Sequence, residues 1–128
     1  MVFYRETLFA RALEKLVGAG GYRVAYLISR TGLVWAKTAA ADRQENVAAL
    51  TAAAAEIFRR TVAVGLGQVE ELEIRRETGD VFTFYPFIHA GEAEEEFYIV
   101  TLSAQGEGNK AAVSAVIDEL KGDLEAFY

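Results

Sequence analysis

"YRVAYLISRTGLVWAK", residues 22–37, is the stretch of this chain that decides its fold. Its first half, residues 22–29, is rich in aromatic and β-branched residues and apolar on both faces, whereas a half-exposed strand would alternate more cleanly. Residues 30–32, Arg-Thr-Gly, predict a tight turn, and residues 33–37 return as an antiparallel partner. The stretch therefore predicts a hairpin whose first strand lies inside a sheet and is covered on both sides.

Helical periodicity lies on both sides of this hairpin along the chain. A first helix is predicted over residues 7–17, where the glycine-rich stretch at 18–21 ends it. A second helix is predicted to begin at Asp42, which forms a capping box with Glu45, and to end near Val64. Asn109 is expected to cap a last helix whose apolar positions keep the 3.6-residue period to the end of the sequence.

Three more strand-like segments, residues 69–77, 81–88 and 97–103, lie between the second helix and the last. The predicted order of elements is therefore α-β-β-α-β-β-β-α. Because two of the strands are apolar on both faces, helices must cover both sides of the sheet. We predict an α+β fold, an α/β/α sandwich around one five-stranded antiparallel sheet, which forms a single domain over residues 1–128.

The composition excludes several classes of function. The formal net charge of −6 argues against a nucleic acid partner, because the surface does not attract phosphate backbones. The absence of cysteine excludes disulfides and zinc–thiolate sites. The longest apolar run, residues 47–55, is too short to insert in a membrane, and the first residues contain no signal-peptide core. We expect a cytoplasmic protein, and nine arginines against four lysines are typical of a GC-rich bacterial genome.

The sequence predicts no enzyme, no metal site and no cofactor. The one histidine, His89, is expected in a loop and has no partner for nucleophilic catalysis. The run of glutamates at 92–96 lacks the glycine-bearing spacing of a calcium loop and is interpreted as a solvated hairpin tip. The glycines at 18–21 and 65–67 follow helices instead of opening them, so they do not form phosphate loops. Trp35 is expected to pack in the core rather than to anchor a partner.

The second predicted helix contains "NVAALTAAAAEIFRR", residues 46–60, with one side of small residues. Four large side chains are expected to lie on the sheet: Val47, Leu50, Ile57 and Phe58. The alanines that then point outward or flank the outward side include Ala48, Ala49, Ala52 and Ala55. Small outward side chains let a second helix approach closely. The alternative is that alanine is present only as a good helix former.

The segment "EELEIRR", residues 70–76, changes sign along its length. If it is an edge strand that pairs with its own copy, the two-fold axis preserves faces, so the numbers of paired residues add to an even total. Centring the pairing on Glu73 sets each neighbouring glutamate against an arginine, although it brings the two Glu73 side chains together. The facing pairs are Glu70 with Arg76, Glu71 with Arg75, and Leu72 with Ile74. These pairs select the register, so we predict an isologous homodimer with one continuous sheet.

Several stretches together resemble the Roadblock/LC7 family, and the resemblance covers nearly the whole chain. The stretches that carry it are "ALEKL" (12–16), "VAYLISRTGLVWA" (24–36), "ADRQENVAALTAAAAEI" (41–57), "VFTFYPF" (81–87), "FYIVTLS" (97–103) and "NKAAVSAVIDELKGDL" (109–124). The resemblance implies a profilin-like layout and a homodimer formed through the middle helix and the third strand.

The resemblance also implies a partner. Members of this family serve as platforms for Ras-like GTPases or as scaffold subunits, and the bacterial branch similar to MglB binds a small GTPase and promotes its GTP hydrolysis without donating an arginine finger. This chain would then be a non-enzymatic module with a GTPase-activating or scaffold role. By position on the middle helix, the contacts to the GTPase would be Gln44, Thr51, Arg59 and Arg60.

Two other hypotheses stay open at this stage. A small-ligand sensor of PAS- or profilin-like architecture would need a roomy cavity with a few convergent polar groups. The aromatic residues that would fill or line such a cavity are Tyr22, Tyr26, Phe82, Phe84 and Tyr98. The third hypothesis is a purely structural homo-oligomer, which would not bind a GTPase.

Overall fold

The computed structural model describes residues 2–18, 21–38, 44–89, 95–104 and 108–127. The helices are α1 (Val2–Gly18), α2 (Gln44–Ala63) and α3 (Lys110–Phe127). The strands are β1 (Val24–Ser29), β2 (Val34–Lys37), β3 (Leu72–Arg75), β4 (Asp80–His89) and β5 (Glu95–Ala104). The order along the chain confirms the predicted α-β-β-α-β-β-β-α arrangement.

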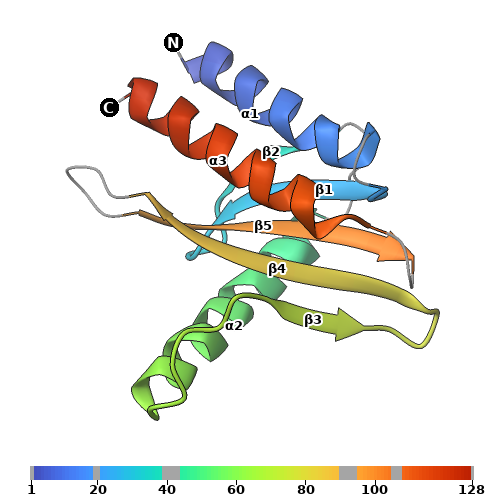
Figure 1. Cartoon of the computed structure of the whole chain (residues 1–128), viewed down its shortest axis with the longest axis vertical. Coiled ribbons are helices and arrows are strands. Elements are labelled where there is room, and N and C mark those ends of the chain that lie inside the picture. Colours follow the sequence, from blue (N-terminus) through green and yellow to red (C-terminus); the bar gives the residue numbers. More distant parts are fainter. Residues whose placement is uncertain (1, 19–20, 39–43, 90–94, 105–107, 128) are drawn as a thin grey trace.

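The strands form one antiparallel sheet in the order β2-β1-β5-β4-β3. Figure 1 shows α1 and α3 side by side on one face of the sheet and α2 on the other. β1 lies between β2 and β5, and its first five residues are buried. The predicted sandwich and the central place of the first strand are therefore confirmed.

The β1–β2 hairpin and the last helix begin as the sequence predicts. Gly32 has a φ of 91°, a left-handed conformation that only glycine adopts without strain. The backbone N–H of Ser29 donates to the carbonyl of Leu33 at 2.9 Å and closes the turn. Before α3, the side-chain oxygen of Asn109 accepts from the N–H of Ala111 at 3.0 Å, which confirms the predicted cap.

Two apolar cores form, one on each face of the sheet. On the α1–α3 side, Phe9, Leu27 and Phe97 pack with Leu120. Trp35 lies edge-on to Phe97 with 4.9 Å between ring centroids, so it packs against the core as predicted, although it is only partly buried. On the α2 side, five large side chains form the centre of the second core: Tyr26, Val47, Phe58, Phe84 and Tyr98. The aromatic residues that a sensor would need around a ligand therefore pack mainly against one another and the helices.

Three predictions about local structure were wrong. His89 does not lie in a loop, because it is the last residue of β4 and pairs with Glu95 of β5. The hairpin strands thus extend further than the aromatic pattern predicted, and Glu95 and Glu96 belong to β5 instead of the tip. β3 is shorter than predicted, since it covers only Leu72–Arg75. The predicted cap Asp42 and the glutamates Glu92 and Glu94 lie outside the described residues.

Candidate interaction surface

β3 is an edge strand, as the homodimer hypothesis requires. Among the described strands it pairs with β4 alone, from Leu72 opposite Phe84 to Arg75 opposite Val81. The N–H of Arg76 donates to the carbonyl of Asp80 at 2.9 Å, in the same register. Backbone groups alternate in direction along an antiparallel strand, so the even-numbered residues of β3 bond to β4. The N–H and C=O groups of Glu73 and Arg75 therefore point away from the sheet and are available to another strand.

The side chains of β3 alternate between the two faces of the sheet. Leu72 and Ile74 are half-buried against the core under α2. Glu73 and Arg75 lie on the opposite face, with 3.9 Å between their carboxylate and guanidinium groups. Lys110, the first residue of α3, reaches this face and bonds Glu71 at 2.6 Å. This contact raises the pKa of Lys110, because the carboxylate stabilises the charged ammonium.

Arg76 is engaged within its own subunit. Its guanidinium donates to both carboxylate oxygens of Asp80, at 2.6 and 2.9 Å, and lies 5.8 Å from the centre of the Phe82 ring. Thr78 donates to the same carboxylate at 2.6 Å. The predicted pairing of Arg76 with Glu70 of a second copy would have to compete with this fork-shaped pair. Of the two predicted charge pairs, the one between Glu71 and Arg75 is therefore the stronger candidate.

The Arg76–Asp80 pair predicts an acid dependence of stability. The hydrogen bonds from Arg76 and Thr78 lower the pKa of Asp80 below its ordinary value of 3.8. A carboxyl group with a lowered folded-state pKa contributes stability above its unfolded-state pKa, and this contribution is lost as the pH falls through the folded-state value. We expect Asp80→Asn to lower the unfolding midpoint in urea at pH 7, and the difference from wild type to shrink below pH 4. A difference that persists unchanged at pH 2 would contradict the assignment.

The face of α2 that lies on the sheet differs from the predicted one. Its buried positions are Val47, Thr51, Ala54, Ala55 and Phe58. Leu50 and Ile57 were expected on the sheet, but they are 39% and 49% exposed. Ala55 was expected to point outward, but it is fully buried.

The reason is that small residues let α2 approach the sheet closely. Ala54, Ala55 and Thr51 occupy the centre of the contact, so the two larger aliphatic residues fall at its margin. The hydroxyl of Thr51 donates to the carbonyl of Val47 at 2.8 Å, so its burial leaves no donor unpaired. Periodicity identifies a helical stripe, but it cannot distinguish a stripe centred on large residues from one centred on small ones.

The three remaining alanines do not lie beside β3. Ala48, Ala49 and Ala52 line a shallow depression of about 540 Å³ together with the β1–β2 turn. A Cβ atom on Gly32 would lie 3.4 Å from the carbonyl oxygen of Ala48, so the turn packs closely against this flank of α2. Residues of the β1–β2 turn line this depression and residues of β3 do not, so these alanines lie apart from the β3 edge.

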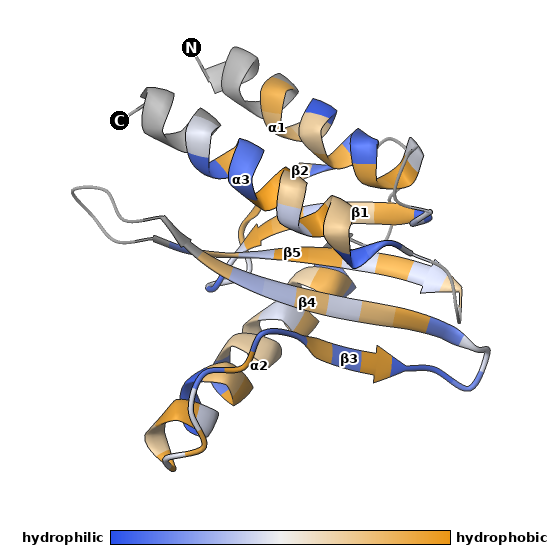
Figure 2. Ribbon diagram, viewed as in Figure 1, coloured by the Kyte–Doolittle hydropathy of each residue, from blue (hydrophilic) through white to orange (hydrophobic). Residues whose placement is uncertain are grey.

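The flank of α2 nearer β3 is apolar instead. Leu50 borders a groove of about 470 Å³, which continues over Ile74, Phe82 and Leu102 of the sheet, with Arg76 at its rim. Ile57 lies two turns further along the same side of the helix. The C-terminal end of α2 is largely orange in Figure 2. Val62 in its last turn, and Val64 and Leu66 just after the helix, are all more than half exposed. We call the side of α2 that carries Leu50 and Ile57 the Leu50–Ile57 flank. It was missed as a surface because the sequence pattern assigned both residues to the core.

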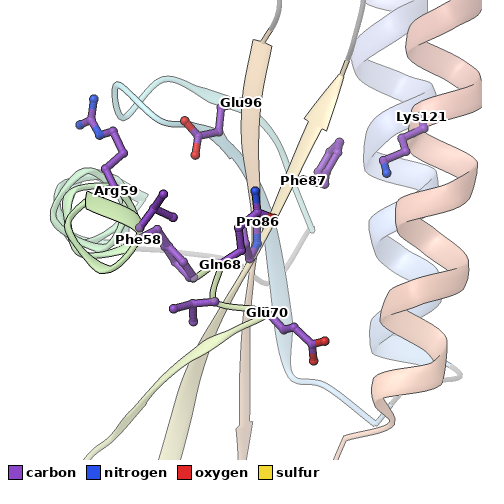
Figure 3. A pocket seen from close by; sticks show the side chains of 10 residues that line it. Phe58, Arg59, Gln68, Glu70, Pro86, Phe87, Glu96 and Lys121 are labelled. Carbon is purple, nitrogen blue, oxygen red and sulfur yellow. The ribbon is translucent and has the colours of Figure 1, made fainter. Parts of the chain in front are cut away.

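A third hollow, of about 610 Å³, lies where β4 continues beyond Phe84, past the first residue of β3. Figure 3 shows Phe58 and Arg59 of α2, Pro86 and Phe87 of β4, Glu96 of β5 and Lys121 of α3 around it. Its charged residues are of both signs, so it does not select one charge type. Pro86 has no N–H to offer to an added strand. Of these two neighbouring edges, β3 is therefore the better site for strand pairing.

The residues expected to contact a GTPase do not form one surface. Arg59 and Arg60 are exposed, and both donate to Glu56, at 2.9 and 3.2 Å. Thr51 is fully buried on the side of α2 that packs on the sheet, so it cannot contact a partner directly. The prediction that Thr51 contacts the GTPase was therefore wrong. Gln44 is the first residue of α2, and its side chain lies outside the described residues.

Within the described ranges, no group of three or more histidine or acidic residues is arranged to hold a metal ion. No described helix is long and apolar enough to cross a membrane. The features that stand out in this part of the chain are the free edge of β3 and the apolar Leu50–Ile57 flank beside it.

Solved structures with the same fold include MglB proteins. An MglB with a tetrameric arrangement is 18% identical to this chain, with a TM-score of 0.73 over 95% of this chain and 91% of that one. MglB of Myxococcus xanthus is 12% identical, with a TM-score of 0.64 over 97% and 94%. Profilin IA of Acanthamoeba castellanii is 15% identical, with a TM-score of 0.52 over 91% and 95%, so the profilin-like layout is confirmed.

No curated protein sequence matches this chain significantly. At these identities the structural matches establish the fold alone. The family model for the Roadblock/LC7 domain, in contrast, matches residues 8–84, which is more than half of the chain and includes α2 and β3. Taken with the fold, this match shows that the chain belongs to the Roadblock/LC7 domain family.

Proposed function

We propose that this protein is a homodimeric, non-enzymatic interaction module that binds and regulates a small Ras-like GTPase. The observation that carries the proposal is the unpaired edge of β3 beside an exposed apolar helix flank. Open sheet edges and contiguous apolar surfaces are both unfavourable in a monomer, and a second copy covers both.

The proposed dimer pairs β3 with its own copy, antiparallel and centred on Glu73. The outward backbone groups of Glu73 and Arg75 then bond to the partner strand, and Leu72 faces Ile74. The two α2 helices lie on the same face of the joined sheet, and the Leu50–Ile57 flank of each is turned toward the partner. Ala48, Ala49 and Ala52 line the depression beside the β1–β2 turn and are not part of the proposed contact.

The GTPase partner is proposed from family membership and from the MglB-like fold. Of the four expected contacts, Arg59 and Arg60 are exposed on α2 and free of the proposed dimer contact. Two adjacent arginines could contact acidic groups of a GTPase, provided that their bonds to Glu56 rearrange.

We expect Arg59→Glu with Arg60→Glu to weaken GTPase binding by at least about tenfold, since like charges across an interface are costly. Binding would be measured by biolayer interferometry against a Ras-like GTPase of the source organism, loaded with GDP or with a GTP analogue. The matched control is Arg23→Glu, an exposed arginine outside α2. If no Ras-like GTPase binds the wild-type dimer, the partner is wrong and the structural homo-oligomer remains.

A further inference from the structure

Lys110 connects the start of α3 to the free edge of the sheet. Its ammonium lies 2.6 Å from one carboxylate oxygen of Glu71 and 3.8 Å from one of Glu73. A cation in the first turn of a helix is unfavourable with respect to the helix dipole, so helix stability does not explain a lysine here. The other carboxylate oxygen of Glu71 is buried and has no hydrogen-bond partner in the described structure. Lys110 is thus the main electrostatic partner of an otherwise incompletely paired acidic group.

On the same face of β3, the proposed dimer brings two negatively charged side chains together. Pairing centred on Glu73 places this residue opposite its own copy, where two Cα atoms of a hydrogen-bonded pair are about 5.5 Å apart. Like charges that lie directly opposite each other destabilise a strand pair. Arg75 lies 3.9 Å from Glu73 of its own subunit, but in this register it also faces Glu71 of the other copy, so one guanidinium is shared between two carboxylates. A further positive charge is needed beside the axis, and Lys110 is close enough to supply it.

We propose that Lys110 is a specificity-determining residue for self-association, which fixes the register of β3 by placing a positive charge beside Glu73 of each subunit at the two-fold axis. The inference rests on the proposed homodimer. In the alternative register, centred on Ile74, Glu73 faces Arg75 of the other copy and Glu71 faces Glu77, so Lys110 would act on Glu71 and not on Glu73. The energetic coupling between Lys110 and Glu73 in dimerisation therefore distinguishes the two registers.

The test is a double-mutant cycle between Lys110 and Glu73. The dimer dissociation constant would be measured by sedimentation equilibrium for wild type, Lys110→Gln, Glu73→Gln and the double variant, with circular dichroism to verify folding. We expect Lys110→Gln to raise the dissociation constant roughly tenfold at low salt, because two copies of the charge are lost per dimer. In the Glu73→Gln background the same substitution should change it less than about twofold. Lys110→Arg, which keeps the charge, should stay within about twofold of wild type.

The matched control is Lys15→Gln, which breaks an exposed pair with Glu119 at 2.7 Å between α1 and α3, away from β3. It should leave the dissociation constant unchanged. Equal effects of Lys110→Gln with and without Glu73 would overturn the role of Lys110 while leaving the dimer intact. Wild-type protein that sediments as a monomer at micromolar concentration would overturn the proposed function itself.

Discussion

Replacing Glu73 with proline is expected to convert the dimer into folded monomers. Proline removes the N–H of residue 73, which points away from β4, so the ladder between β3 and β4 keeps its bonds. The dimer loses the two symmetric hydrogen bonds at its axis, and the proline rings crowd the partner strand. Each lost hydrogen bond is worth about 1 kcal/mol, so the dissociation constant should rise roughly 100-fold once steric crowding is included.

The control for this variant is Glu73→Ala, which keeps the N–H and removes the carboxylate together with the rest of the side chain beyond Cβ. It should dimerise at least as well as Glu73→Gln, because both lack the repulsion at the axis. Sedimentation velocity measures the dimer, and thermal unfolding of the isolated monomer shows whether proline at position 73 is tolerated. A Glu73→Pro protein that remains a dimer, with an unchanged dissociation constant, would show that β3 does not pair with its copy.

A second large effect is expected on α2, where the two flanks of the helix give opposite results. Leu50→Glu with Ile57→Glu should abolish dimerisation, because it places two charges per subunit where the proposed partner helix packs. Full burial of a Leu or Ile side chain is worth about 1.5–3 kcal/mol. Since both residues already lose about half of their exposure within the subunit, we expect the dissociation constant to rise at least roughly 100-fold.

The matched comparison is Ala48→Glu with Ala52→Glu, which adds the same charge to the other flank of the same helix. Both alanines are half-buried beside the β1–β2 turn, and a glutamate there can extend into solvent. We expect this variant to remain a dimer. If the alanine variant dissociates and the Leu50–Ile57 variant does not, the alanine ridge expected from the sequence is the interface after all.

The periodic patterns of the sequence were sufficient to predict the fold. Strand runs that are apolar on both faces, such as residues 24–28, require cover on both sides, and this alone leads to helices on both faces of the sheet. Local signals such as Gly32 and Asn109 act through neighbouring residues, so they could be interpreted without the rest of the chain. The self-pairing hypothesis, which rests on the change of sign along residues 70–76, supposed an edge strand, and β3 is one.

The candidate surface depended on facts that periodicity does not contain. The sequence shows that α2 has an apolar stripe, but the shape of the sheet decides that Thr51 and Ala55 lie at its centre and Leu50 and Ile57 at its margin. Arg76 forms an ion pair with Asp80 across a turn. Lys110 bonds Glu71 although 39 positions separate them. Local spacing determined each helix and strand, because their periods are properties of the backbone. Only the packed tertiary structure decided which side chains remain for a partner, because that depends on distances between elements.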